Sequence, residues 1–172
     1  MTVTSSRSAE LTLPADDQIL IKREFDAPKE LVYKAFTTPE LVKRWWHAKR
    51  GEMTVADIDL RVGGKWRYLM VLQCDDMSEA MEVGFHGEYL EIVPGERIVS
   101  TEIYEGLPQG VSEEEGATVN TATFTEERGR TTITILIQAP SKAARDAIID
   151  SGMEAGLQDA LDLLEETAKS LG

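Results

Sequence analysis

Six strand-like segments follow one another between residues 53 and 139, and this run constrains the fold more than any other feature. Within it, large apolar side chains recur at every second position of Lys65–Leu72, the period expected of a strand with one buried face. Gly63-Gly64 and Pro94-Gly95 are typical of the tight turns that join antiparallel strands. The run therefore predicts an antiparallel sheet. Its expected strands are Met53–Leu60, Lys65–Leu72, Val83–Val93, Arg97–Tyr104, Thr118–Thr125 and Thr131–Gln138.

One more strand and two short helices are expected before this run. Ile19–Phe25 has the composition of a strand. Pro28 stands where the first residue of a helix belongs, and Thr38-Pro39-Glu40 supplies a capping hydroxyl, a proline and an acid for a second helix start. Gly51 marks the end region of that second helix, and the acidic segment Glu105–Gly116 is interpreted as a solvated loop.

The C-terminal segment has a helical rather than a strand-like pattern. Apolar residues such as Ile149, Met153 and Leu157 recur at three- and four-residue spacing and form one stripe. With a capping hydroxyl at Ser141, the pattern predicts a single long helix that ends near Lys169. The order of the elements indicates the α+β class: a curved antiparallel sheet of about six or seven strands wraps around a long C-terminal helix, and two short helices follow the first strand.

A pocket is expected between this helix and the sheet, because a strongly twisted sheet curls and one helix is too narrow to cover its concave face. Gly152 and Gly156 lie one turn apart in the helix. They either leave room for a ligand or let the helix pack closely on the sheet, and the sequence leaves both interpretations open. The residues predicted to bind a ligand are Trp46, Trp66, Tyr68, Met70, His86, Glu88, Leu90, Met153 and Leu157.

His86 and Glu88 are also weak candidates for catalysis. They lie two positions apart on one expected strand, so both side chains point to the same face, which they share with Leu90 and Ile92. Those apolar neighbours predict that this is the inner face, where a histidine–carboxylate pair could act as general acid and base. The alternatives are a solvent-facing pair or a structural hydrogen bond, because a nearby β-bulge would reverse the facing.

The composition limits the classes of partner and cofactor. A formal net charge of −13 disfavours nucleic acid and anionic membrane surfaces, since both attract clustered Lys and Arg. Cys74 is the only cysteine, which rules out an intramolecular disulfide and favours a reducing compartment, the cytoplasm. No metal or other cofactor is expected, because Cys74 and the two histidines lack the spacing of zinc ligands. The length of 172 residues suits a tail or short strand over residues 1–17 and one domain over residues 18–172.

Short motifs occur in a familiar order along residues 10–170: Asp26-Ala27-Pro28, Thr38-Pro39-Glu40, Trp45-Trp46, Asp59–Trp66, Gly87–Pro94, Thr101-Glu102 and Ser151–Gly156. Together they resemble the SRPBCC superfamily, and in particular proteins similar to the C-terminal domain of the activator of the heat-shock protein 90 ATPase. The resemblance implies a helix-grip fold, as in START and birch-pollen-allergen domains, with a deep, mostly apolar cavity for lipids, polyketides or other hydrophobic molecules. It carries no shared catalytic motif onto this chain.

Three functions are considered, in order of preference. The first is binding of a small hydrophobic, lipid- or polyketide-like molecule in the cavity. The second is a polyketide cyclase- or hydrolase-like enzyme that uses the same cavity. The third is a chaperone-interacting module, which would need an exposed apolar patch near Trp45–His47. A homodimer is compatible with the sequence, whereas nucleic acid and membranes are not expected partners.

Overall fold

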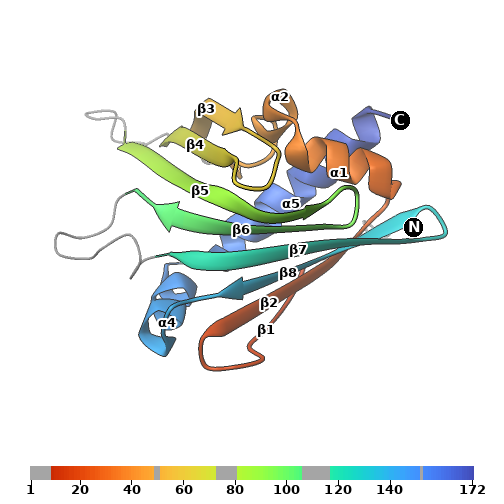
Figure 1. Cartoon of the computed structure of the whole chain (residues 1–172). Coiled ribbons are helices and arrows are strands. Elements are labelled where there is room, and N and C mark those ends of the chain that lie inside the picture. The colour runs from red at the N-terminus through yellow and green to blue at the C-terminus, as the bar shows by residue number, and fades with distance from the viewer. Residues whose placement is uncertain (1–8, 49–50, 73–80, 106–116, 152) are drawn as a thin grey trace.

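Eight antiparallel strands form one curved sheet in the structure, a computed structural model that describes residues 9–48, 51–72, 81–105, 117–151 and 153–172 (Figure 1). The strands are β1 (Glu10–Thr12), β2 (Gln18–Phe25), β3 (Gly51–Ile58), β4 (Lys65–Leu72), β5 (Met81–Val93), β6 (Arg97–Tyr104), β7 (Thr118–Glu127) and β8 (Arg130–Gln138). The helices are α1 (Lys29–Thr37), α2 (Pro39–Val42), α4 (Lys142–Asp150) and α5 (Met153–Ser170). The predicted α+β class and helix-grip architecture are confirmed.

The connection from β2 to β3 places the two short helices. Across the sheet the strands follow the order β1-β2-β8-β7-β6-β5-β4-β3, so β2 lies near one edge and β3 forms the other. The chain between them crosses the sheet and carries α1 and α2 over one end of it (Figure 1). There α1 packs against α5 and β7. The concave face is therefore closed at one end by the short helices and along its length by α5.

The strand predictions agree closely with the structure. β4 and β6 have the predicted bounds, and the count reaches eight because β1 pairs with β2 at the edge of the sheet. Gly63 and Gly95 adopt φ of 82° and 75°, the left-handed conformation that these turns require. The other edge is less regular, since the register of β3 against β4 shifts between Met53 and Val55.

Two predictions about the helices are wrong. The second short helix ends at Val42, and Gly51 opens β3 instead of following a helix. The C-terminal helix is divided in two, since α4 ends at Asp150 and α5 begins at Met153. Gly152 itself, like Cys74 and residues 106–116 of the expected acidic loop, lies outside the described residues.

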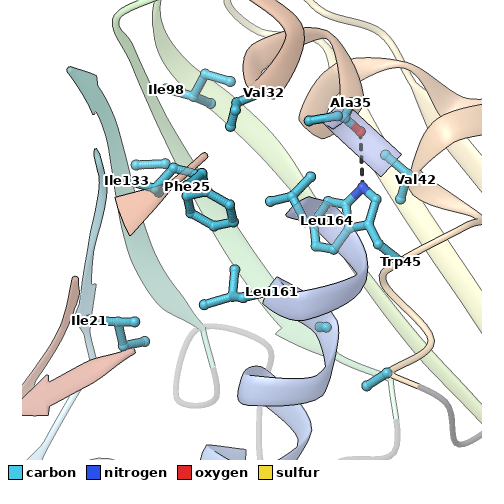
Figure 2. Close-up of a cluster of buried hydrophobic side chains, with 14 of the residues drawn as sticks. Ile21, Phe25, Val32, Ala35, Val42, Trp45, Ile98, Ile133, Leu161 and Leu164 are labelled. Atoms are coloured by element: carbon cyan, nitrogen blue, oxygen red, sulfur yellow. Dashed lines mark hydrogen bonds between the residues drawn. The ribbon is translucent and has the colours of Figure 1, made fainter. Parts of the chain in front are cut away.

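The hydrophobic core lies between the sheet, α5 and the short helices (Figure 2). Phe25 of β2 and Leu164 of α5 are fully buried and point toward each other across this layer (Figure 2). Trp45 is buried beside them, and its Nε1 donates to the carbonyl of Ala35 at 2.9 Å, which fixes the turn after α2 to α1. The core thus fills the end of the sheet that the short helices cover.

Polar side chains attach the β1–β2 edge of the sheet to α5. Arg23 of β2 is buried and forms ion pairs with Asp162 at 2.7 Å and Glu165 at 3.3 Å. Next to β1, both backbone groups of Ala9 bond to the side-chain amide of Gln158: Ala9 N donates to Oε1 at 2.9 Å, and Nε2 donates to Ala9 O at 3.0 Å. These contacts hold α5 along the sheet.

Candidate ligand-binding cavity

A cavity of about 390 Å³ lies between α5 and the sheet, and it extends to the turn that follows α2. Because strands expose alternate side chains, every second residue of β4, β6 and β7 contributes to its wall. The wall is mainly apolar. Its aromatic members are Phe36, Trp45, Trp46, Trp66, Tyr68, Phe85 and Tyr89.

Most of the predicted ligand-binding residues lie on this wall. Gly156 of α5 also lines the cavity. Because glycine has no side chain, this position leaves space in the cavity, which favours the interpretation that Gly156 makes room for a ligand. Whether these residues contact a ligand stays a prediction. The predicted residues that line the cavity are Trp46, Trp66, Tyr68, Met70, Met153 and Leu157.

The predicted inward facing of the other three residues, His86, Glu88 and Leu90, is wrong. Phe85 and Tyr89 of the same strand line the cavity, so His86 and Glu88, which have the opposite strand parity, point to the outer face. Leu90 is 45% exposed, and the side chains of His86 and Glu88 are 32% and 43% exposed. The proposed histidine–carboxylate pair therefore does not reach the cavity and cannot act there as acid and base.

A β-bulge explains this error. The register of β5 against β6 shifts between Tyr89 and Glu91, which reverses the facing of the residues on either side. Ile92 consequently packs against the core, whereas Leu90 does not. The inward orientation of Ile92 therefore does not imply that His86, Glu88 and Leu90 also point inward.

On the outer face, His86 belongs to a cluster of ionisable side chains. Arg67 donates two hydrogen bonds to the Glu105 carboxylate, each of 2.9 Å, and the Nδ1 of His86 lies 2.9 Å from Glu105 Oε2. The hydrogen bonds from Arg67, and secondarily from His86, lower the pKa of Glu105 to about 2 against a smaller opposing effect of burial. Glu88 pairs separately with Lys65 at 3.4 Å. These contacts tie neighbouring strands together and have a structural role.

Glu102 is the acidic residue on the described cavity wall, and it was not among the predicted site residues. It lies on β6, and its Oε2 accepts a hydrogen bond of 3.1 Å from Asn120 Nδ2 on the neighbouring strand β7. The Asn120 Oδ1 in turn accepts from Thr118 Oγ1 at 3.1 Å. Burial raises the pKa of the Glu102 carboxyl to about 7, and the hydrogen bond from Asn120 partly opposes this. A signal was present in the sequence, because Glu102 shares its strand parity with the buried Ile98.

Close packing supports the aromatic side of the wall. The Nε1 of Trp66 donates to the carbonyl of Thr101 at 3.1 Å, which holds the indole across β5 and β6. Gly87 makes this contact possible, because a Cβ at that position would overlap the Thr101 carbonyl and lie 2.6 Å from the indole nitrogen. Trp46 packs edge-on against Tyr68 with ring centroids 5.2 Å apart. The aromatic groups are therefore held in position by neighbouring strands.

The described residues do not bring three or more His, Cys, Asp or Glu side chains together in a group that could hold a metal ion. Within the same residues, none of the helices has the length and apolar character needed to cross a bilayer.

A family model described as Activator of Hsp90 ATPase homolog 1-like protein matches residues 26–169. The chain belongs to this family. Membership in the Activator of Hsp90 ATPase homolog 1-like family agrees with the short sequence motifs, which resemble those of this family, and with the helix-grip fold. No curated protein matches the chain.

Solved structures with the same fold cover nearly the whole chain. A protein from Rhodobacter sphaeroides has a TM-score of 0.83 and 21% identity, over 95% of this chain and 99% of that one. Protein CV1439 from Chromobacterium violaceum has a TM-score of 0.69 and 27% identity, over 87% of this chain and 95% of that one. DynU16, a protein of the dynemicin biosynthetic locus, has a TM-score of 0.63 and 19% identity, over 90% of this chain and 48% of that one. The likeness to the first and third of these shows the fold alone.

Proposed function

We propose that this protein binds a small hydrophobic molecule, lipid- or polyketide-like, in the cavity between α5 and the sheet. The observation that carries the proposal is the cavity itself. Its volume of about 390 Å³ is in the range of small-molecule sites, and its wall combines many apolar side chains with a few polar groups. Rigid aromatic side chains on that wall offer a large contact area to an apolar ligand.

The two other functions considered have less support. An enzyme that uses the cavity has no candidate acid–base pair from the sequence analysis, since His86 and Glu88 lie on the outer face. DynU16 belongs to a biosynthetic locus, but its likeness to this chain concerns the fold. A chaperone-interacting surface near Trp45–His47 is not supported, because Trp45 is buried. The cytoplasmic location and the homodimer stay predictions.

Two measurements test the proposal. Native mass spectrometry of the protein, purified without detergent, should show a copurifying small molecule of fixed mass. In addition, equilibrium dialysis with the neutral probe 2-ethylnaphthalene should show saturable binding at one site per chain.

A matched pair of α5 variants locates the binding site. Gly156→Leu adds a side chain on the cavity wall, so the affinity for 2-ethylnaphthalene should fall at least tenfold; the helix should tolerate it, since Leu is a better helix former than Gly. Ala155→Leu introduces the same side chain at an exposed position next to it and should leave the affinity unchanged. Absence of saturable binding, or equal affinity of the two variants, would refute a ligand site in this cavity.

A further inference from the structure

Glu102 is chemically unlike the rest of the cavity wall. It is the only Asp or Glu among the described residues that line the cavity, and no Lys or Arg accompanies it there. Asn120 takes up one carboxyl oxygen, Oε2, through the 3.1 Å hydrogen bond from its Nδ2. The other oxygen, Oε1, receives no hydrogen bond from the described residues. That oxygen can therefore form a hydrogen bond with solvent or with a bound molecule.

The position of the carboxyl group is set by its neighbours on the sheet. Glu102 projects from β6 on the same face as Ile98 and Ser100, which also line the cavity. The bond from Thr118 Oγ1 occupies the oxygen of the Asn120 amide and leaves its nitrogen to face Glu102. The group therefore enters the cavity in one orientation, supported by two strands.

The surroundings favour the neutral form of this carboxyl below about pH 7. Burial raises the pKa of Glu102 to about 7, and Asn120 is the one neighbour that lowers it. Burial also raises the pKa of the Tyr68 and Tyr89 hydroxyls, so these wall groups stay neutral too. His47 contributes an imidazole from the turn after α2, while β2, β8 and α5 contribute only apolar residues or glycine. Among the residues that the structure describes, no Lys or Arg lies on the wall to hold an ionised carboxylate.

We propose that Glu102 is the polar anchor of the cavity, where its protonated carboxyl donates a hydrogen bond to a carbonyl oxygen of a neutral, otherwise apolar ligand. The proposal rests on the proposed function and names the class of ligand. A cationic ligand fits less well, because it would need the ionised carboxylate and would have to lose its own hydration in an apolar cavity. An anionic ligand would meet neither Lys nor Arg on the part of the wall that the structure describes.

Three naphthalene probes of similar size separate these ligand classes. They are 2-acetylnaphthalene, which carries a carbonyl; 2-ethylnaphthalene, which has no polar group; and 1-(2-naphthyl)ethylamine, which is a cation. At about pH 6, the wild type should bind the acetyl probe about tenfold more tightly than the ethyl probe. This factor corresponds to one hydrogen bond from a buried donor to the carbonyl of the probe. This preference should disappear by about pH 8.5, because the carboxyl has then lost its proton.

Two substitutions assign the effect to Glu102. Glu102→Gln keeps a donor that does not titrate, so the preference for the acetyl probe should persist at both pH values. Glu102→Leu removes the donor, so the preference should vanish while the ethyl probe still binds. The glutamine variant also controls for His47, which it leaves unchanged.

Each other outcome overturns the proposal. Equal affinity of the wild type for the acetyl and ethyl probes would show that Glu102 does not donate to a ligand, although the cavity would still bind apolar molecules. Amine binding that strengthens toward pH 8.5 and is lost in Glu102→Gln would assign the cavity to cations. If Glu102→Leu abolished binding of the ethyl probe as well, Glu102 would act by shaping the cavity. Failure of the wild type to bind any probe would refute the ligand site and the anchor together.

Discussion

Replacing Glu102 by glutamine should change how the stability of the protein depends on pH. Burial raises the pKa of the carboxyl from 4.5 to about 7, with Asn120 opposing the shift. In the unfolded chain the group ionises near its ordinary value, so between these two values only the folded protein keeps the proton. The folded state is therefore favoured less and less as the pH rises from about 4.5 through about 7, and the full penalty applies above that interval.

The magnitude follows from the two pKa values. Between about pH 5 and pH 8, the wild type should lose about 2–3 kcal/mol of unfolding free energy through this group. Glu102→Gln keeps an acceptor for the Asn120 amide but does not titrate, so it should be spared that loss. For a chain of this size, the melting temperature of the variant relative to wild type should increase by about 5–10 °C over this range. Thermal unfolding followed by circular dichroism at unit pH steps measures the difference.

The comparison needs a control for net charge, since the chain is acidic as a whole. Glu24→Gln removes one negative charge from an exposed position of β2 and should leave the pH dependence of the wild type almost unaltered. Parallel curves of melting temperature against pH for the wild type and Glu102→Gln would refute the reasoning, because they would show that folding does not perturb the ionisation of Glu102.

Two further substitutions probe the strands that carry the cavity. Gly87→Ala should destabilise the protein by about 1–3 kcal/mol, because the new Cβ would overlap the Thr101 carbonyl beside the Trp66 hydrogen bond; an unchanged midpoint of urea unfolding would contradict this. Glu105→Gln should remove a stabilisation that the wild type has above about pH 4.5 and loses as the pH falls toward about 2, since hydrogen bonds lower the pKa of that carboxyl. The site is partly open to solvent, so we expect only about 1 kcal/mol at neutral pH, and the acid unfolding midpoints of both proteins check it.

Much of the fold could be predicted because its signals are local. The bounds of β4 and β6 follow from side-chain alternation and from turn residues such as Gly63 and Gly95. The division of the C-terminal helix was not visible in the same way. The apolar stripe continues across the break through Ile149 and Met153, so hydrophobic periodicity alone predicts one continuous helix.

The candidate site was predicted less completely, for two physical reasons. A single extra residue at the bulge in β5 reverses the facing of His86 and Glu88, and nothing in the local composition marks that position. Glu102 was passed over because a charged residue is expected at the surface unless it is paired. Alternation along β6 could have placed this carboxyl on the inner face with Ile98, but only the sheet register brings it next to Asn120 of β7.

The arrangement at the two borders of the sheet bears on how copies of this chain could associate. Exposed strand borders invite pairing with another molecule unless they are short, irregular or covered. Here β1 has only three residues, and the Gln158 amide already occupies the peptide groups of Ala9 beside it. At the opposite border, β3 is kinked between Met53 and Val55. Continuous intermolecular β-ladders are therefore disfavoured on both flanks, and a dimer of this protein would have to meet through its helices, its loops or the outer surface of the sheet.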